Sequence, residues 1–201
     1  MRIVIAIILA YILGSIPFGY LVSRIRFGRD VRSSGSGATG ATNVARQFGV
    51  GWAILVMILD IAKGIVAVLL ANLFLLDVDW LVGVVGIVAI LGHVYPVWIG
   101  FRGGKGVNTA LGVATVISPI GIVFGLIAFG AAFAISKFVS VGSIAATITY
   151  AIAVLAFGEK FGATGTGQFI FAIALPLIVI WTHRDNLKRL LQGKELKPTK
   201  I

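Results

Sequence analysis

The sequence predicts an all-α protein that crosses a lipid bilayer several times, and three observations support this fold class. Hydrophobic residues make up 59% of the 201 positions, and charged residues only 12%. The mean hydropathy is +1.06. The apolar residues form long, nearly uninterrupted stretches. Because a water-soluble fold of this length could not bury so much apolar surface, we expect residues 1–201 to form a single transmembrane domain.

Six apolar stretches indicate the membrane-spanning helices. They cover residues 3–22, 52–76, 80–101, 107–135, 141–157 and 168–181. No small-residue cleavage pattern follows the first stretch, so we interpret it as a retained helix and not as a signal peptide. The fourth stretch contains Ser118-Pro119, and proline breaks or kinks a helix. We therefore predict short or broken helices near Ser118-Pro119.

The placement of charge predicts the number of crossings. If the fourth stretch is divided at Pro119, the chain crosses the membrane seven times and most of its 17 basic residues fall on one side. Asp77, Asp79 and Glu159 fall on the other side. Basic residues of membrane proteins collect in cytoplasmic loops. We therefore predict seven transmembrane helices, with the N-terminus outside and the C-terminus in the cytoplasm.

The net charge of +10 has the same explanation. No basic stripe is interleaved with aromatic residues, as a nucleic-acid-binding surface would require, so we expect the lipid bilayer and no nucleic acid as a partner.

A polar, glycine-rich segment at residues 32–46 is the first candidate phosphate site. Its glycines allow backbone N–H groups to turn toward one point, and Arg46 offers a bidentate fork for a phosphate. A helix that begins at Thr42 or Asn43 would add the partial positive charge of its N-terminus. The simpler alternative is a flexible linker, but linkers rarely end in Ala-Thr-Asn and an arginine. The candidate substrate-binding residues are Ser36, Gly37, Gly40, Thr42 and Asn43.

A second tight turn, Gly103-Gly104-Lys105-Gly106, opens the short segment after residue 106. Alone it is compatible with an ordinary loop that carries a lysine. Together with the first segment it predicts either two bound phosphates or one phosphate held from both sides. We take Gly103 and Gly104 as substrate-binding candidates and Lys105 as a catalytic candidate.

Further polar residues are expected near the same face. His183 ends the last apolar stretch, and there phosphate binding with Asn186 is as reasonable as base catalysis. Ser143 adds a hydroxyl close to Lys137. His93 lies near the end of the third stretch and is more often a polar neighbour than a base.

Asp60 and Lys63 lie inside the second apolar stretch, where an unpaired charge is costly. Their i, i+3 spacing lets them neutralise each other on one helix face. We predict either a structural ion pair that faces the bundle interior or a pair that supports the site.

Several kinds of chemistry are absent from the sequence. The chain has no cysteine, which excludes disulfides, thiolate metal sites and a covalent thioester. No His-x-x-x-x-Asp motif occurs, and its few carboxylates do not cluster as a divalent metal would require. We therefore expect no metal and no cofactor.

Five motifs, taken together, resemble the bacterial acyl-phosphate:glycerol-3-phosphate acyltransferase family. In chain order they are Gly14-Ser15-Ile16-Pro17-Phe18-Gly19, Gly35 to Asn43 with Arg46, Asp60-Ile-Ala-Lys63-Gly64, Gly92-His93 through Gly106, and His183 to Lys197. The resemblance extends over essentially the whole chain. One departure is visible, because Ala38 stands where the family usually reads the asparagine of Gly-Ser-Gly-Asn.

The resemblance implies a multi-pass enzyme of the bacterial cytoplasmic (inner) membrane with its active site on the cytoplasmic side. Such an enzyme transfers the acyl group of acyl phosphate to the 1-hydroxyl of glycerol 3-phosphate. The products are lysophosphatidic acid and phosphate, in the first acylation step of phospholipid synthesis. The implied partners are these two substrates and, transiently, the enzyme that makes acyl phosphate.

The predicted mechanism is direct attack without an acyl-enzyme intermediate, since acyl phosphate is already activated. Either a side chain or a substrate phosphate oxygen serves as the base. The catalytic candidates are Lys105, His183 and Arg46; the supporting candidates are Asp60, Lys63 and His93. The alternative is a transporter or channel for an organic phosphate, since broken helices also build transport sites. A transporter would place its motifs near the middle of the membrane and show internal repeats, whereas these motifs lie at one face and no repeat is visible.

Overall fold

The structure, a computed structural model, describes residues 1–74, 78–161 and 165–197. All regular secondary structure in these residues is helical, as predicted. The helices are α1 Arg2–Gly14, α2 Phe18–Phe27, α3 Ala41–Phe48, α4 Val50–Phe74, α5 Leu81–Val94, α6 Val107–Ile117, α7 Pro119–Ser136, α8 Val139–Phe157, α9 Thr166–Thr182 and α10 Arg184–Leu191, with short 3-10 helices at Val31–Ser33, Val97–Ile99 and Gly158–Phe161. Asp77, which entered the charge argument, lies outside the described residues.

Within the described residues, five helical segments are long and apolar enough to cross a membrane, or six if the bent pair α9 and α10 forms one span. The five are Arg2–Phe27, Val50–Leu73, Leu81–Ile99, Pro119–Ser136 and Val139–Lys160. Helix α6 is apolar but has only 11 residues, about 17 Å at 1.5 Å per residue, which is shorter than the ~30 Å hydrocarbon core. Seven crossings and the orientation of the termini stay predictions.

The first apolar stretch is not one uninterrupted helix. Helix α1 ends at Gly14, and α2 begins at Phe18, directly after Pro17. Proline lacks an N–H and disfavours the helical conformation in the residue before it. The break leaves the carbonyl of Ile16 without its helical donor, and this oxygen accepts a hydrogen bond of 2.8 Å from Lys63 Nζ of α4.

The break predicted at Ser118-Pro119 is confirmed. Helix α6 ends at Ile117, Ser118 takes an extended φ of −153°, and Pro119 occupies the first turn of α7. The third stretch also ends early, because α5 stops at Val94, before Pro96. The chain then returns through a loop to α6.

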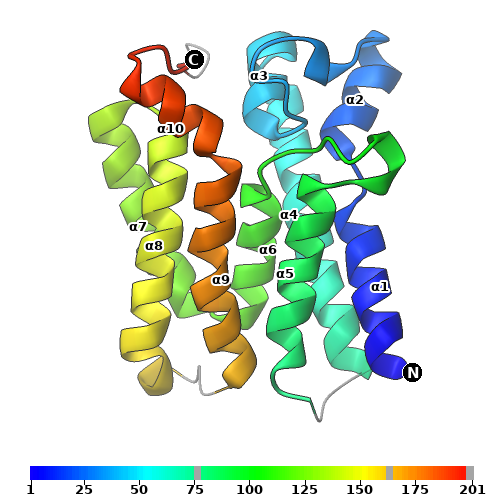
Figure 1. The fold of residues 1–201 in the computed structure, drawn as a ribbon, viewed down its shortest axis with the longest axis vertical. Helices are drawn as coiled ribbons and strands as arrows, with labels where there is room; N and C mark the ends of the chain where they lie inside the picture. Colours follow the sequence, from blue (N-terminus) through cyan, green and yellow to red (C-terminus); the bar gives the residue numbers. More distant parts are fainter. Residues whose placement is uncertain (75–77, 162–164, 198–201) are drawn as a thin grey trace.

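Helix α6 occupies the middle of the bundle, where it contacts α4, α5, α7 and α9 (Figure 1). The backbones of α6 and α4 pack closely because both helices carry glycine at the contact. A Cβ on Gly64 would lie 2.3 Å from the carbonyl oxygen of Thr109, and one on Gly112 would lie 2.0 Å from that of Ile61. The surrounding core includes Val85, Ala89, Ile90, Val113, Phe171 and Val179.

The polar motifs gather at one end of the bundle. Figure 1 shows α2, α3, α10 and the loop between α5 and α6 at the top, whereas the N-terminus, the start of α5 and the end of α8 lie at the bottom. The two glycine-rich segments and the basic C-terminal segment that begins at Arg184 therefore share one end, as the charge pattern predicted.

Candidate active site

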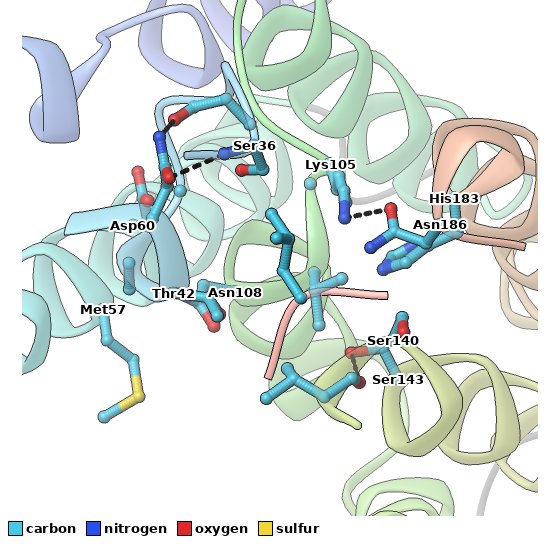
Figure 2. A pocket seen from close by; sticks show the side chains of 18 of the residues that line it. Ser36, Thr42, Met57, Asp60, Lys105, Asn108, Ser140, Ser143, His183 and Asn186 are labelled. Atoms are coloured by element: carbon cyan, nitrogen blue, oxygen red, sulfur yellow. Dashed lines mark hydrogen bonds between the residues drawn. The ribbon is translucent and has the colours of Figure 1, made fainter. Parts of the chain in front are cut away.

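A cavity of about 270 Å³ lies between the two glycine-rich segments, the upper ends of the bundle helices and the C-terminal segment (Figure 2). A second cavity, of about 190 Å³, has four lining residues in common with it: Ser36, Ala38, Lys105 and Asn186. The polar residues of the main cavity are Ser36, Thr42, Asn43, Arg46, Asp60, His93, Lys105, Asn108, Ser140, Ser143, His183, Asn186 and Glu195. Most of the candidates named from the sequence therefore come together in space.

Asn43 organises the first glycine-rich segment. Its Nδ2 donates to the carbonyls of Val31 (2.8 Å) and Ala38 (2.9 Å), and its Oδ1 accepts from the amide of Ser36 (3.0 Å). Gly35 has a φ of +65°, and a Cβ on it would lie 2.1 Å from Asn43 Oδ1. Asn43 was predicted to bind substrate, but its polar atoms are occupied by the loop that they shape.

The segment is therefore ordered and is not a flexible linker. Helix α3 begins at Ala41, directly after Gly40, whereas a start at Thr42 or Asn43 was expected. Gly40 and Thr42 line the main cavity, whereas Gly37, with a φ of +70°, lies outside both cavity linings. Gly37 thus serves the turn, and Thr42 is placed where a ligand could reach it.

The second turn differs from what its glycines suggested. The amide of Gly103 donates to the carbonyl of Val94 (3.1 Å), and the amide of Gly104 donates to that of His93 (3.1 Å). A Cβ on Gly103 would lie 2.1 Å from the carbonyl oxygen of His93. These two amides are directed toward α5, although both residues line the second cavity. The glycines allow the turn to press against α5 and so place Lys105.

Lys105 lines both cavities, and its Nζ donates to Oδ1 of Asn186 (Figure 2). Burial lowers the pKa of this lysine to about 8, although the nearby carboxylate of Glu195 acts in the opposite direction. The ammonium form still predominates at pH 7. Lys105 is thus a cation inside the site whose side-chain bond is to a neutral amide.

His183 is buried beside Asn186 in the wall of the main cavity. Its Nδ1 lies 2.8 Å from the carbonyl oxygen of Val179, so Nδ1 carries the proton and Nε2 is an acceptor. Burial and the charge of Lys105 lower the pKa of His183 to about 4. His183 is therefore neutral at pH 7 and does not add a positive charge to the site.

The C-terminal segment brings a carboxylate into the site that sequence reasoning did not identify. Glu195 Oε1 accepts from Nδ2 of Asn186 (2.5 Å) and from the hydroxyl of Ser140 (3.1 Å), and Oε2 accepts from Nε of Arg189 (2.9 Å). Only 2% of the Glu195 side chain is exposed. These hydrogen bonds lower its pKa, against the opposite effect of burial. The available signal in the sequence was that Glu195 is one of two carboxylates, with Asp185, in the basic segment after His183.

Arg46 holds the same segment in place. Its Nη2 donates to the carbonyl of Leu196 (3.0 Å) and its Nε to that of Lys197 (3.2 Å). A guanidinium has five N–H donors, so others remain for a ligand. Arg46, a catalytic candidate from the sequence, lines the main cavity, and its two hydrogen bonds hold the C-terminal segment beside that cavity.

Two further polar residues, Ser143 and Asn108, line the main cavity. Ser143, a predicted binding residue, lines the main cavity while its hydroxyl donates to the carbonyl of Val139 (2.9 Å). Asn108, in the first turn of α6, was not identified from the sequence, because a single asparagine after a glycine-rich turn carries no distinctive pattern.

The predicted ion pair of Asp60 and Lys63 is confirmed, with Oδ1 and Nζ 2.8 Å apart. His93 joins it, since Nδ1 of its ring lies 3.0 Å from the same Nζ. Asp60 and His93 line the main cavity, whereas Lys63 does not. The pair therefore lies at the wall of the main cavity, with Asp60 in the lining and Lys63 outside it.

Comparison with known proteins shows which family the chain resembles. Residues 4–193 match the family model described as glycerol-3-phosphate acyltransferase. A protein of that name from Synechococcus sp. (strain CC9902) is 43% identical over 190 residues, covering 93% of this chain and 90% of the relative. One from Anaeromyxobacter dehalogenans (strain 2CP-1 / ATCC BAA-258) is 40% identical over 191 residues, covering 93% and 92%.

Two solved structures are similar to the whole chain. One is the crystal structure of PlsY (YgiH), an integral membrane glycerol 3-phosphate acyltransferase, in the glycerol 3-phosphate form: TM-score 0.89, 37% identity, 99% of this chain and 96% of that chain covered. The other is its lysophosphatidic acid form, with TM-score 0.86, 36% identity, and 98% and 95% covered. The chain described here therefore belongs to the glycerol-3-phosphate acyltransferase family.

Proposed function

We propose that this protein transfers the acyl group of an acyl phosphate to the 1-hydroxyl of glycerol 3-phosphate, giving lysophosphatidic acid and inorganic phosphate for phospholipid synthesis. One observation carries the proposal: a single cavity joins a partly buried cation, Lys105, and several hydrogen-bond donors to an apolar wall. The names of the relatives support glycerol 3-phosphate as the acceptor and an acyl transfer as the reaction.

Two phosphate-bearing substrates are compatible with the two cavities. Ser36, Lys105 and Asn186 line both of them, so a phosphate on either side would meet the same ammonium group. A cation between two anions reduces their mutual repulsion and stabilises the negative charge that develops during transfer. Thr42, Ser143 and the remaining donors of Arg46 would contact the substrate in the main cavity.

The apolar wall supports an acyl-chain substrate. Met57 of α4, Phe129 of α7 and Val139 of α8 line the main cavity. Met57 is 37% exposed, on a helix that is apolar enough to face lipid. We propose that the chain lies between α4 and the α7–α8 pair and extends toward the bilayer, which removes the need for a closed pocket.

The transfer proceeds by direct attack. The 1-hydroxyl oxygen of glycerol 3-phosphate forms a bond to the acyl carbon, the bond from that carbon to the phosphate oxygen breaks, and phosphate leaves with the electron pair. The hydroxyl proton goes to a phosphate oxygen. With a pKa of about 4, His183 is a weaker base than a phosphate monoester, whose second pKa is ~6. His183 would instead accept a hydrogen bond at Nε2 from the glycerol.

The function is tested with purified protein, palmitoyl phosphate and glycerol 3-phosphate. We expect phosphate release that requires both substrates and yields lysophosphatidic acid in equal amount. Lys188→Ala is a suitable control variant, because this exposed lysine of α10 lines neither cavity. Uptake of an organic phosphate into vesicles without turnover would establish a transporter and reject the enzyme.

We also propose that the end of the bundle that carries the site faces the cytoplasm. The chain has no cysteine, so single-cysteine variants can be labelled without background. In intact cells, a membrane-impermeant thiol reagent should label Glu159→Cys and spare Arg29→Cys, and both should react after lysis. Labelling of Arg29→Cys from outside would reverse the orientation.

A further inference from the structure

The cluster of Asp60, Lys63 and His93 at the wall of the main cavity has polar contacts that the predicted ion pair does not require. Lys63 Nζ lies 2.8 Å from Asp60 Oδ1, 2.8 Å from the carbonyl oxygen of Ile16 and 3.0 Å from Nδ1 of His93. The exposed fractions are 1% for Asp60, 4% for Lys63 and 6% for His93. Three acceptor positions thus surround one buried ammonium group.

This arrangement specifies the tautomer of His93. An ammonium group has three N–H donors and cannot accept a hydrogen bond, so Nδ1 of His93 must be unprotonated where it meets Lys63. In the alternative, Nδ1 would donate to Asp60 Oδ1, but those atoms are 3.5 Å apart and the Nδ1 proton would face the nearby ammonium. The neutral ring of His93 therefore carries its proton on Nε2.

The Nε2 edge of the ring lies against the turn that carries Lys105. A Cβ on Gly104 would lie 2.2 Å from His93 Nε2, so only glycine allows this approach. The ring also lines the main cavity. Among the described residues, the side-chain hydrogen bond of His93 involves Nδ1, which leaves the Nε2–H donor available beside the turn that carries Lys105.

We propose that His93 binds substrate: its Nε2–H donates to an oxygen of the phosphate that Lys105 holds in the main cavity, and Lys63 with Asp60 keeps the donor in place by fixing the tautomer. This assignment rests on the proposed function, because it takes the anion to be a substrate phosphate. His93 then supplies a neutral donor beside a cation, and the Lys63–Asp60 pair adds no net charge to the site.

The tautomer can be measured directly, because the chain has two histidines. In protein labelled with ¹⁵N-histidine, nitrogen chemical shifts should show protonated Nε2 for His93 and protonated Nδ1 for His183, with assignment by a His183→Gln variant. Saturating inorganic phosphate should shift the Nε2 resonance of His93. A proton on Nδ1 of His93, or a resonance unmoved by both phosphate and glycerol 3-phosphate, would overturn the proposal.

A matched pair of variants tests the role in binding. The glutamine amide of His93→Gln places an N–H near the position of Nε2, whereas that of His93→Asn places one near Nδ1. The KM of each substrate is measured with the other substrate saturating. For the substrate whose phosphate His93 binds, we expect His93→Asn to raise the KM about tenfold more than His93→Gln does, with a smaller change in kcat.

Equal KM values for the two variants would reject His93 as a phosphate ligand. Failure of the His93 proposal can be distinguished from failure of the proposed function. Absence of turnover in the wild-type protein would reject the acyl transfer, whereas the tautomer and the phosphate-dependent shift are measured without any turnover. The NMR measurement uses the unaltered protein, so it also decides the proposal if either variant fails to fold.

Discussion

Two lysines of the polar end of the bundle, Lys63 and Lys105, differ in the groups that they contact; Lys63 is buried, whereas Lys105 is partly buried. Lys63 is paired with the carboxylate of Asp60 and with two further acceptors, and it lies outside the cavity lining. Lys105 lines both cavities and bonds to the neutral amide of Asn186. A buried cation with its own carboxylate is therefore part of the framework, whereas a cation that lacks such a contact is available to an anionic ligand.

The largest expected effect is on catalysis at Lys105. Lys105→Ala should lower kcat/KM by about a thousandfold, because it removes the ammonium that stabilises charge in the transition state. Thermal unfolding in detergent should change little, and Lys188→Ala should retain normal turnover. A Lys105→Ala protein with near-normal kcat/KM would contradict the assignment of this lysine.

The next effect is on stability at Lys63. Lys63→Met leaves the carboxylate of Asp60 buried without its cation, which should destabilise the fold by about 3–5 kcal/mol. The double variant Asp60→Asn with Lys63→Met should recover much of that loss, since no unpaired charge remains. Unfolding followed by tryptophan fluorescence measures both; equal stability of the single and double variants would show that the pair is not the framework element described here.

The smallest expected effect is a dependence of kcat/KM on pH that arises from Lys105. Burial lowers the pKa of Lys105 to about 8, so kcat/KM should fall about tenfold per pH unit above that value as the ammonium is lost. Lys105→Arg keeps its charge and should not show this alkaline decline, whatever its absolute activity. A decline of equal steepness in both proteins would assign the titration to another group.

The lowered pKa of Lys105 also affects the stability of the fold, which should rise with pH where kcat/KM falls. An unfolded lysine keeps its proton up to about pH 10.4, whereas folded Lys105 loses it near 8. Between these values the unfolded state binds more protons, so the contribution of Lys105 favours the folded state increasingly as pH rises through this window. Measured without substrate, the contribution should be absent in Lys105→Arg.

Local patterns were sufficient for much of the architecture. Pro119 ends one helix and starts another because proline acts through its own backbone, and Asp60 pairs with Lys63 because i, i+3 positions share a helix face. The interruption at Pro17 has the same local cause, but the continuous hydropathy of residues 3–22 concealed it.

The details of the site depended on contacts between distant parts of the chain. The pattern of Gly103 and Gly104 suggested free amide donors, but α5 accepts both hydrogen bonds. Glu195 enters the cavity through partners on α8 and α10, and Arg46 reaches carbonyls some 150 positions away. No local pattern indicates which backbone group will return to meet a given side chain.

Composition, charge distribution and helix breaks follow from each residue's own transfer free energy and backbone geometry, and these are properties that a linear chain already possesses. Which cation is neutralised and which nitrogen of His93 carries a proton depend instead on packing, because hydrogen bonds act over about 3 Å and are decided by whichever atoms the fold brings that close.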